Sequence, residues 1–281
     1  MFPVRHIQQR VHLTPPSNFS TTARQQAHWQ PCSIDNVHKQ FWAYVELLKR
    51  EGIATTIGEP APVHNPDAIY AYDSCLCLPA GAIVLQSIKQ NRQREIDLVR
   101  SDLKRLHIPV LGEILHPAHI DGGDILWLTE SEVAVGRGWR TNDLAIAQLQ
   151  HLLQPFSITV RRYDLSNLLG QEHCLHLMSV ISMLDDHTAL VYERGMPIAL
   201  LQRLAELNIR TTPVAEQEWL SLGCNVLALG EKRVIALAGN PITCTRMEAA
   251  GFRVLPLNAA DLCLAGEGGP TCLTRLLPFP A

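Results

Sequence analysis

The sequence predicts an α/β protein in which five ββαβ units form a propeller-like ring with pseudo-fivefold symmetry. Similar segments recur at steps of 56, 54, 53 and 50 residues along the 281-residue chain, and they begin at Val11, Asp67, Asp121, Cys174 and Cys224. From the second unit on, short apolar runs precede a segment of helical period and a β-branched run. A fixed period of this size is typical of repeat architectures, whose units bury one another's apolar faces.

Turn residues divide the apolar runs of the units into hairpins. Pro79-Ala80-Gly81 does so in the second unit, and residues 185–187 and 230–232 take the same place in the fourth and fifth units. Short apolar runs beside such turns favour strands. The run from Asp67 to Asp73 is also predicted as a strand, which ends at Asp73.

Each hairpin is followed by a predicted helix and a returning strand. Apolar residues recur every three or four positions, at Val37, Phe41, Val45 and Leu48 in the first unit and at Ile96, Val99, Leu103 and Leu106 in the second. This period predicts one buried stripe on each helix. The returning strands are predicted at 53–58, 108–114, 158–164, 209–214 and 252–257. The stretch from Gly268 is predicted to supply the strand that closes the ring.

Composition favours a single domain over residues 1–281, located in the cytoplasm. Hydrophobic residues make up 47% of the chain and charged residues 18%, as in globular proteins. The net charge of −3, without a basic run, argues against a nucleic-acid partner. No long apolar run predicts a membrane helix, and Arg5 and Arg10 interrupt the region where a signal sequence has its apolar part. The eight cysteines are scattered along the chain, which is typical of reduced thiols.

Four reactive side chains fall at comparable places in different units. Asp121 directly precedes an apolar run, His176 lies in a predicted strand, Asp73 ends another, and Cys272 follows Gly268-Gly269. Each has an ordinary structural explanation: a turn, a core histidine, a paired acid and a buried small thiol. If the units surround an axis, however, all four can converge there. A thiolate, an imidazole and two carboxylates suit a planar guanidinium, which offers forked N–H donors and an electrophilic carbon.

The motifs around these residues resemble those of a known family. The relevant segments are Asp67 to Asp73, Arg92 to Glu95, Asp121 to Asp124, Arg140 to Asn142, His176 to Ser179, and the Gly-Gly-x-x-Cys that ends at Cys272. From about Pro66 to Arg275 the chain resembles the guanidine-modifying enzymes of the pentein fold, which are five-bladed ββαβ propellers. Among these enzymes, it is most similar to dimethylarginine dimethylaminohydrolase.

The resemblance implies a role for each matched residue. Cys272 is expected to be the nucleophile, His176 the general acid and base, and Asp121 the acid that positions the substrate and catalytic groups. Asp73 is expected to hold the guanidinium, with Asp67 in the same substrate-binding segment. Arg92 and Arg140 are expected to bind the substrate's α-carboxylate. For both arginines, an exposed position at the start of a helix is the alternative.

The chain also departs from the family pattern at two positions. Tyr72 stands where the dimethylarginine hydrolases have a glutamate, which predicts an altered substrate preference. Met178 stands where arginine deiminases and amidinotransferases of this fold have an aspartate two residues after the histidine, which argues against both activities. Transfer of the amidino group to an amine, or a binding function without catalysis, remain the alternatives.

The expected chemistry is hydrolysis of a small guanidino compound through a covalent thiouronium adduct on Cys272, giving a ureido product and an amine. No metal or organic cofactor is expected, because the substrate carries its own positive charge. His116-x-x-His119 is interrupted by Pro117 and makes a poor zinc site. Cys75-x-Cys77 is expected in the core, and a homo-oligomer remains open.

Overall fold

The computed structural model describes residues 10–166, 170 and 175–278. The predicted start of the fourth repeat at Cys174, and Arg5, lie outside these residues. The described chain divides into two compact units. Residues 123–258 make up the continuous unit, and residues 10–122 together with 259–278 make up the split unit. The prediction of one domain over 1–281 stays a prediction.

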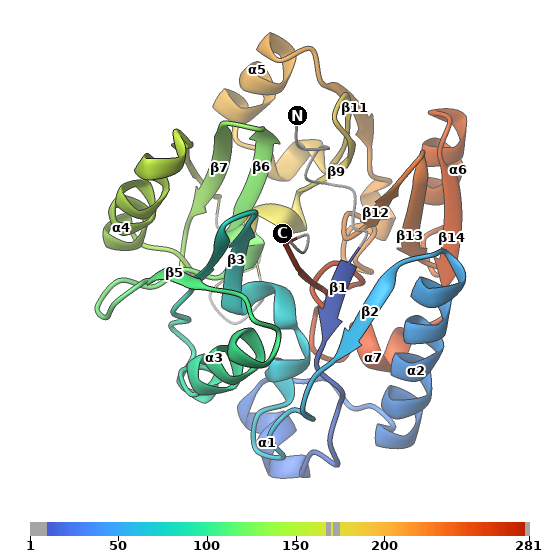
Figure 1. The fold of residues 1–281 in the computed structure, drawn as a ribbon. Helices are drawn as coiled ribbons and strands as arrows, with labels where there is room; N and C mark the ends of the chain where they lie inside the picture. The colour runs from blue at the N-terminus through green and yellow to red at the C-terminus, as the bar shows by residue number, and fades with distance from the viewer. Residues whose placement is uncertain (1–9, 167–169, 171–174, 279–281) are drawn as a thin grey trace. The chain divides into compact units, whose positions relative to one another are not determined.

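The split unit contains two three-stranded sheets (Figure 1). Their strands, in spatial order, are β15 (Arg275–Leu276), β1 (Arg10–Leu13) and β2 (Ala54–Ile57), then β3 (Cys75–Leu78), β4 (Gly81–Val84) and β5 (Val110–Glu113). Its helices are α1 (Thr21–Gln26), α2 (Ile34–Arg50), α3 (Glu95–Arg105) and α7 (Ala260–Cys263). Because β15 pairs antiparallel with β1, a strand from the stretch after Gly268 completes the sheet that begins near the other end of the chain.

The continuous unit contains three further sheets of the same design. Their strands are β6 (Ile125–Thr129), β7 (Glu132–Arg137) and β8 (Thr159–Asp164); β9 (Ile181–Asp185), β10 (Thr188–Val191) and β11 (Arg210–Pro213); and β12 (Leu227–Gly230), β13 (Arg233–Leu237) and β14 (Arg253–Leu257). Its helices are α4 (Asp143–Leu153), α5 (Ile198–Glu206) and α6 (Pro241–Ala249). In each sheet a hairpin pairs antiparallel and the strand after the helix pairs parallel, which confirms the ββαβ pattern.

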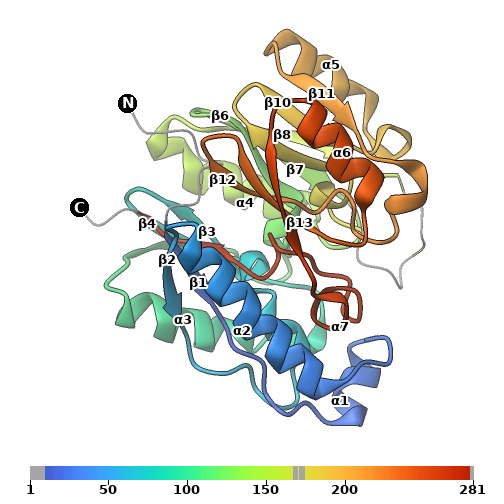
Figure 2. The ribbon, with the colours of Figure 1, turned by 90° about the vertical axis from the view of Figure 1, so that its right-hand side faces the viewer.

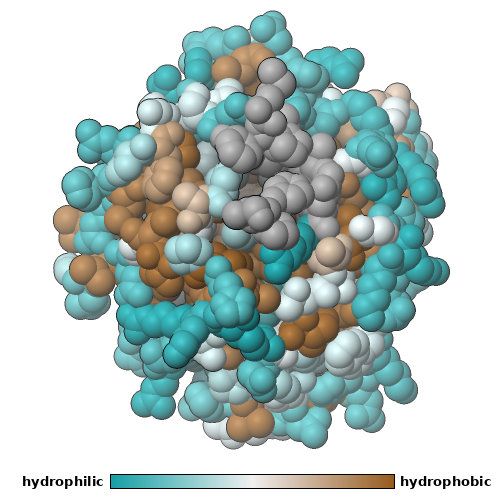
Figure 3. All heavy atoms as spheres, in the orientation of Figure 1, coloured by the Kyte–Doolittle hydropathy of each residue, from teal (hydrophilic) through white to brown (hydrophobic). Residues whose placement is uncertain are grey.

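Helix α2 illustrates how the sequence period produces a layer over a sheet. Its predicted stripe is fully buried, whereas the outer side of α2, at the lower right of Figure 1, is largely hydrophilic in Figure 3. Ser33 caps the first turn by accepting a hydrogen bond from the Asn36 N–H, and Gly52 follows the last turn with a φ of 80°. Figure 2 shows α2 in front of β2, with which it is in contact.

Two segments predicted as strands are turns instead, and the closing strand begins only after Cys272. Residues 67–73 form the 3₁₀ turns η1 (Pro66–Ile69) and η2 (Ala71–Ser74), because their backbone groups bond locally: the Tyr70 N–H donates to the Asp67 carbonyl at 2.9 Å. His176 is the N-cap of the 3₁₀ turn η6 (Leu177–Ser179). Cys272 lies in a turn before the short strand β15. The reactive residues therefore stand on turns that lead into strands.

Among the helices of the described residues, none combines the length and the apolar character needed to cross a membrane.

Candidate active site

Two predicted acids, Asp73 and Asp121, meet in the split unit. Both are buried, and an oxygen of one carboxylate lies within 4.8 Å of an oxygen of the other. Gly122 makes this approach possible, because a Cβ atom at this position would lie only 2.3 Å from the Tyr72 carbonyl oxygen. Two carboxylates this close can share one cation, either a guanidinium or a metal ion.

The backbone of Tyr72 also ties the predicted nucleophile to these acids. Its N–H donates a hydrogen bond to the Cys272 carbonyl oxygen at 3.1 Å, and the Cys272 side chain is partly buried. The structure thus brings Asp73, Asp121 and Cys272 together around one peptide segment.

Neighbouring groups fix the turn that carries Cys272. The Tyr44 hydroxyl on α2 donates to the Pro270 carbonyl at 2.9 Å, and the Thr274 hydroxyl donates to the Thr271 carbonyl at 3.0 Å. A Cβ atom on Gly268 would lie 2.3 Å from the Tyr70 ring. The backbone before Cys272 therefore lies against an aromatic side chain of the same unit, close to η1 and η2.

Arg92 is almost fully buried, with 4% of its surface exposed, so the exposed helix-start alternative is wrong. Its guanidinium donates to Asp73 at 2.6 Å, to both carboxylate oxygens of Glu95 at 2.9 Å, and to the Tyr70 carbonyl at 3.1 Å. Burial alone lowers the pKa of Arg92, but Glu95 and Asp73 raise it above its usual value, so the guanidinium stays charged. These contacts indicate that Arg92 holds Asp73 in place.

Carboxyl groups outnumber the guanidinium in the described part of this cluster. The carboxyls are those of Asp73, Asp121 and Glu95, and the guanidinium is that of Arg92. Burial raises the pKa of Glu95, although Arg92 opposes this shift. Buried carboxylates are stabilised by a partner of opposite charge, so such a group of acids suits a cation.

Asp67 has protein partners on both of its carboxylate oxygens. One oxygen accepts from Trp29 Nε1 at 2.8 Å, and the other accepts from Lys89 Nζ at 2.5 Å and Asn91 Nδ2 at 3.0 Å. Burial raises the pKa of Asp67, but Lys89 and Arg92 lower it below its usual value. The carboxylate of Asp67 therefore holds three side chains of its own unit, and its predicted contact with substrate stays a prediction.

The continuous unit carries His176. This side chain is 4% exposed, and the His176 backbone N–H donates to the Ser179 hydroxyl at 3.0 Å. The next residue, Leu177, donates its backbone N–H to Asp124 Oδ1 at 2.8 Å. Asp124 Oδ2 accepts from the Thr141 hydroxyl at 2.6 Å, and Thr141 directly follows Arg140.

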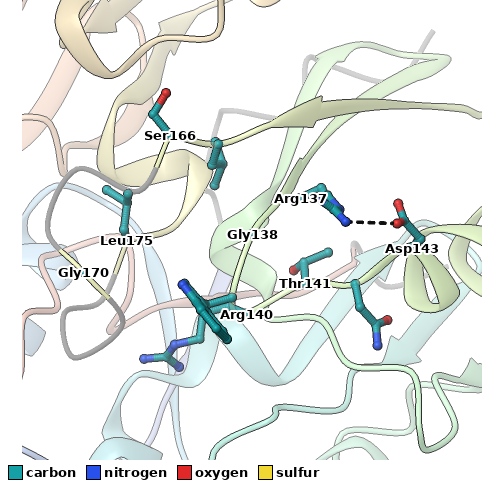
Figure 4. Close-up of a pocket in the computed structure, with 11 residues that line it drawn as sticks. Arg137, Gly138, Arg140, Thr141, Asp143, Ser166, Gly170 and Leu175 are labelled. Carbon is teal, nitrogen blue, oxygen red and sulfur yellow. Dashed lines mark ion pairs between the residues drawn. The ribbon is translucent and has the colours of Figure 1, made fainter.

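A cavity of about 330 Å³ lies beside these residues in the continuous unit (Figure 4). Arg140, Thr141 and Leu175 are among the residues that line it. Arg137 points to Asp143 and forms an ion pair with it at 3.4 Å. The cavity thus extends between the residue that precedes His176 and the loop that carries Arg140.

Sequence reasoning missed two site residues, Asp124 and Glu95. Asp124 is the second acid of the Asp-Gly-Gly-Asp motif, and Glu95 follows Arg92 by three residues, a spacing at which side chains of one helical turn meet. Both of these spacings can be read directly from the sequence. That Asp124 reaches Leu177 depends on a contact across 53 positions, which no local pattern reveals.

The sequence family described as N,N dimethylarginine dimethylhydrolase, eukaryotic, matches residues 14–275. The chain belongs to this family. With its buried acids beside a cysteine turn on repeated ββαβ sheets, it is therefore an amidinohydrolase-type enzyme of the pentein fold, which acts on guanidino C–N bonds.

Individual relatives agree with this assignment. The chain is 28% identical over 236 residues to N(G),N(G)-dimethylarginine dimethylaminohydrolase of Streptomyces coelicolor, covering 84% of each chain. It is 27% identical over 242 residues to an arginine deiminase of Mycobacterium marinum, covering 74% of this chain and 60% of that protein.

Solved structures show the same fold. A cysteine-to-serine mutant of the dimethylarginine dimethylaminohydrolase of Pseudomonas aeruginosa, complexed with citrulline, has a TM-score of 0.79 and 20% identity, with 97% of this chain and 100% of that chain covered. The N-terminal domain of ArgZ, a cyanobacterial arginine dihydrolase, has a TM-score of 0.81 and 18% identity over 96% and 98% of the two chains. The fold class is therefore the five-bladed α/β pentein propeller.

Proposed function

We propose that the protein hydrolyses the guanidinium group of arginine or of an N-substituted arginine, releasing a citrulline-like ureido product and an amine. The observation that carries this proposal is the pair of buried acids, Asp73 and Asp121, whose oxygens lie within 4.8 Å of one another beside the turn of Cys272. Membership of the dimethylarginine hydrolase family supports the same chemistry.

In the proposed reaction the acids orient the substrate and the thiolate attacks it. Asp73 and Asp121 accept hydrogen bonds from the guanidinium, which turns its central carbon toward Cys272. The sulfur forms a bond to that carbon and gives a tetrahedral intermediate. His176 then donates a proton to the departing nitrogen, the C–N bond breaks, and a thiouronium adduct remains on Cys272.

Water completes the proposed cycle. His176, now neutral, removes a proton from a water molecule as its oxygen attacks the adduct carbon. Collapse of the second tetrahedral intermediate breaks the C–S bond, restores the thiolate and releases the ureido product. The residues required for these steps are Cys272, His176 and the two acids, and the scheme uses no metal or organic cofactor.

The amino-acid end of the substrate is assigned to Arg140. Arg140 lines the 330 Å³ cavity of the continuous unit together with the polar side chains of Thr141 and Asn142. The planar guanidinium of an arginine can donate two parallel hydrogen bonds to one carboxylate. Arg92 is already bonded to Asp73 and Glu95, so Arg140 is the better supported anchor. Tyr72 removes the charge that the family's glutamate supplies, and we expect preference to move away from dimethylarginine.

The experiment is an assay of the purified chain with a panel of guanidines. The panel contains arginine, monomethylarginine, dimethylarginine and agmatine, the last of which lacks a carboxylate, and both ureido product and released amine are measured. Cys272→Ser should abolish turnover, because a hydroxyl is a much poorer nucleophile than a thiolate. The matched control is Cys32→Ser, which replaces another partly buried thiol of the split unit.

Mass spectrometry of enzyme quenched during turnover should find the adduct on the peptide that contains Cys272. Full activity of Cys272→Ser would remove the nucleophile assignment. Turnover of agmatine alone would remove the amino-acid substrate and leave guanidine chemistry, and no turnover of any guanidine would refute the proposed function.

A further inference from the structure

Asp124 connects two segments of the continuous unit that the proposed reaction uses in different ways. One segment is the η6 turn, whose N-cap is His176, and the other is the loop of Arg140 and Thr141. The carboxylate of Asp124 accepts one hydrogen bond from each, from the Leu177 N–H at 2.8 Å and from the Thr141 hydroxyl at 2.6 Å. Each donor is the immediate chain neighbour of a proposed functional residue.

The surroundings of Asp124 make this bridge rigid. The side chain of Asp124 is fully buried, as is that of Thr141. Strand β7 passes so close that a Cβ atom on Gly136 would lie 3.0 Å from Asp124 Oδ1 and 2.9 Å from the Leu177 Cβ atom. A buried carboxylate with short charge-assisted bonds in so tight a space fixes its donors more firmly than a neutral acceptor does.

From this geometry we infer that Asp124 is a positioning residue for both ends of the substrate: it sets the His176 turn through Leu177 and the Arg140 loop through Thr141. The inference rests on the proposed function, because the two ends are the reacting guanidinium and the carboxylate. Asp124 itself does not touch the substrate. Its loss should therefore change kcat through the hydrogen bond to Leu177 and KM through the hydrogen bond to Thr141. We call these two hydrogen bonds the two arms.

Single variants separate the two arms. Thr141→Val removes the hydroxyl that donates to Asp124 and leaves the Leu177 bond, so KM should rise about tenfold while kcat changes less than threefold. Thr141→Ser keeps a hydroxyl and should restore KM to within about twofold of the wild type. Asp124→Asn weakens both arms and should lower kcat about tenfold and also raise KM about tenfold.

The matched control is Ser182→Ala. The Ser182 hydroxyl donates a buried hydrogen bond to the Cys224 carbonyl at 2.7 Å in the same unit, and both residues lie outside the two segments that Asp124 joins. Its loss should lower stability and leave kcat and KM unchanged. A purely structural role of Asp124 would give the same pattern.

Hydrogen exchange provides a readout that does not depend on activity. In Asp124→Asn the Leu177 amide should exchange about tenfold faster than in the wild type, while the Ser182→Ala variant keeps wild-type exchange at this amide. Folded Asp124→Asn with wild-type kcat and KM, or with only KM changed, would overturn the inference. If that variant does not fold, a wild-type KM in Thr141→Val would overturn it.

The proposed function fails separately. A wild-type protein that turns over no guanidine would refute the hydrolase proposal, and the inferred coupling of kcat and KM would fall with it. A wild-type protein that is active, together with an Asp124→Asn variant as active as wild type, would refute only the role of Asp124.

Discussion

The guanidinium of Arg92 lies between Asp73 and Glu95, and this placement leads to a test of its role. If Arg92 holds Asp73, Arg92→Ala leaves buried carboxylates unpaired and should lower the free energy of unfolding by about 3–5 kcal/mol. Urea denaturation measures this loss. Arg100→Ala removes an exposed arginine that pairs with Glu113 and should leave stability nearly unchanged. If Arg92→Ala instead raises KM and leaves the free energy of unfolding unchanged, Arg92 binds the substrate's carboxylate, as the sequence predicted.

His12 predicts how stability depends on pH. It is fully buried, its Nε2 lies 2.8 Å from Asp102 Oδ2, and its Nδ1 has no hydrogen-bond partner within the described part of the chain. Burial lowers the pKa of His12, and the Arg275 guanidinium adds to this, although the hydrogen bond to Asp102 opposes it. The folded protein therefore keeps His12 neutral at pH values where the unfolded chain protonates it.

The free energy of unfolding should consequently fall as the pH drops below about 6.5, the usual pKa of histidine, because the unfolded state then binds one more proton. Above that pH, His12 contributes no pH dependence. Urea denaturation at pH 7.5, 6.5 and 5.5 should show the decline in the wild type and a smaller one in His12→Gln. His151→Gln, which replaces an exposed histidine, serves as the control. An equal decline in His12→Gln and the wild type would contradict the assignment.

At the scale of the elements, the turn that contains Gly122 determines whether the two acids meet. Gly122→Ala places a methyl group against the Tyr72 carbonyl and the Asp73 Cα atom, at 2.3 and 3.0 Å before relaxation. We expect a loss of about 1–3 kcal/mol in stability and a fall in kcat/KM, because the backbone must move and separate the carboxylates. Gly239→Ala is the control, since no atom lies within 4 Å of a Cβ atom there. Wild-type kcat/KM in Gly122→Ala would show that this approach is dispensable.

Sequence periodicity predicted the repeated elements well and the turns poorly. The stripe of α2, with Val37 and Phe41, and the hairpin turn at Pro79 depend on neighbours a few residues apart, so the local pattern contains them. The turns of Asp73 and His176 span one 3₁₀ turn each, which is too short to show a period, and the apolar residues around them imitate a strand.

The burial of Arg92 depends on Asp73, which lies 19 positions away, and so it required the structure. The structure places the carboxylates of Asp73 and Asp121 close together and the Cys272 carbonyl on the same peptide segment, and the roles expected for these residues stay predictions. His176 belongs to the continuous unit, and its convergence with the other three stays a prediction.

At the scale of the whole molecule, a buried polar cluster joins four segments that lie far apart in the sequence. Arg275 on β15 donates to Asp102 on α3 at 3.2 Å and to the Ser74 hydroxyl at 2.9 Å, while His12 on β1 contacts the same Asp102 oxygen. Because both partners share one carboxylate, the effects of Arg275→Gln and His12→Gln on stability should be coupled by about 0.5–3 kcal/mol in a double-mutant cycle.

The control cycle combines Arg275→Gln with Glu46→Gln. Glu46 is an exposed residue of α2 whose partner is Lys49, outside the cluster. These two effects should add within about 0.5 kcal/mol. Strict additivity in the first cycle would show that the last strand is held independently of β1 and α3.

Tyr72 serves the site through its peptide groups: its N–H bonds to the Cys272 carbonyl, and its carbonyl lies against Gly122. Any residue other than proline supplies the same N–H and carbonyl. Mutational drift at this position can therefore alter the side chain beside Asp73 while the spacing of nucleophile and acids persists. Substitutions at position 72 should therefore change which guanidine the site prefers without moving the backbone that holds Cys272 and the two acids.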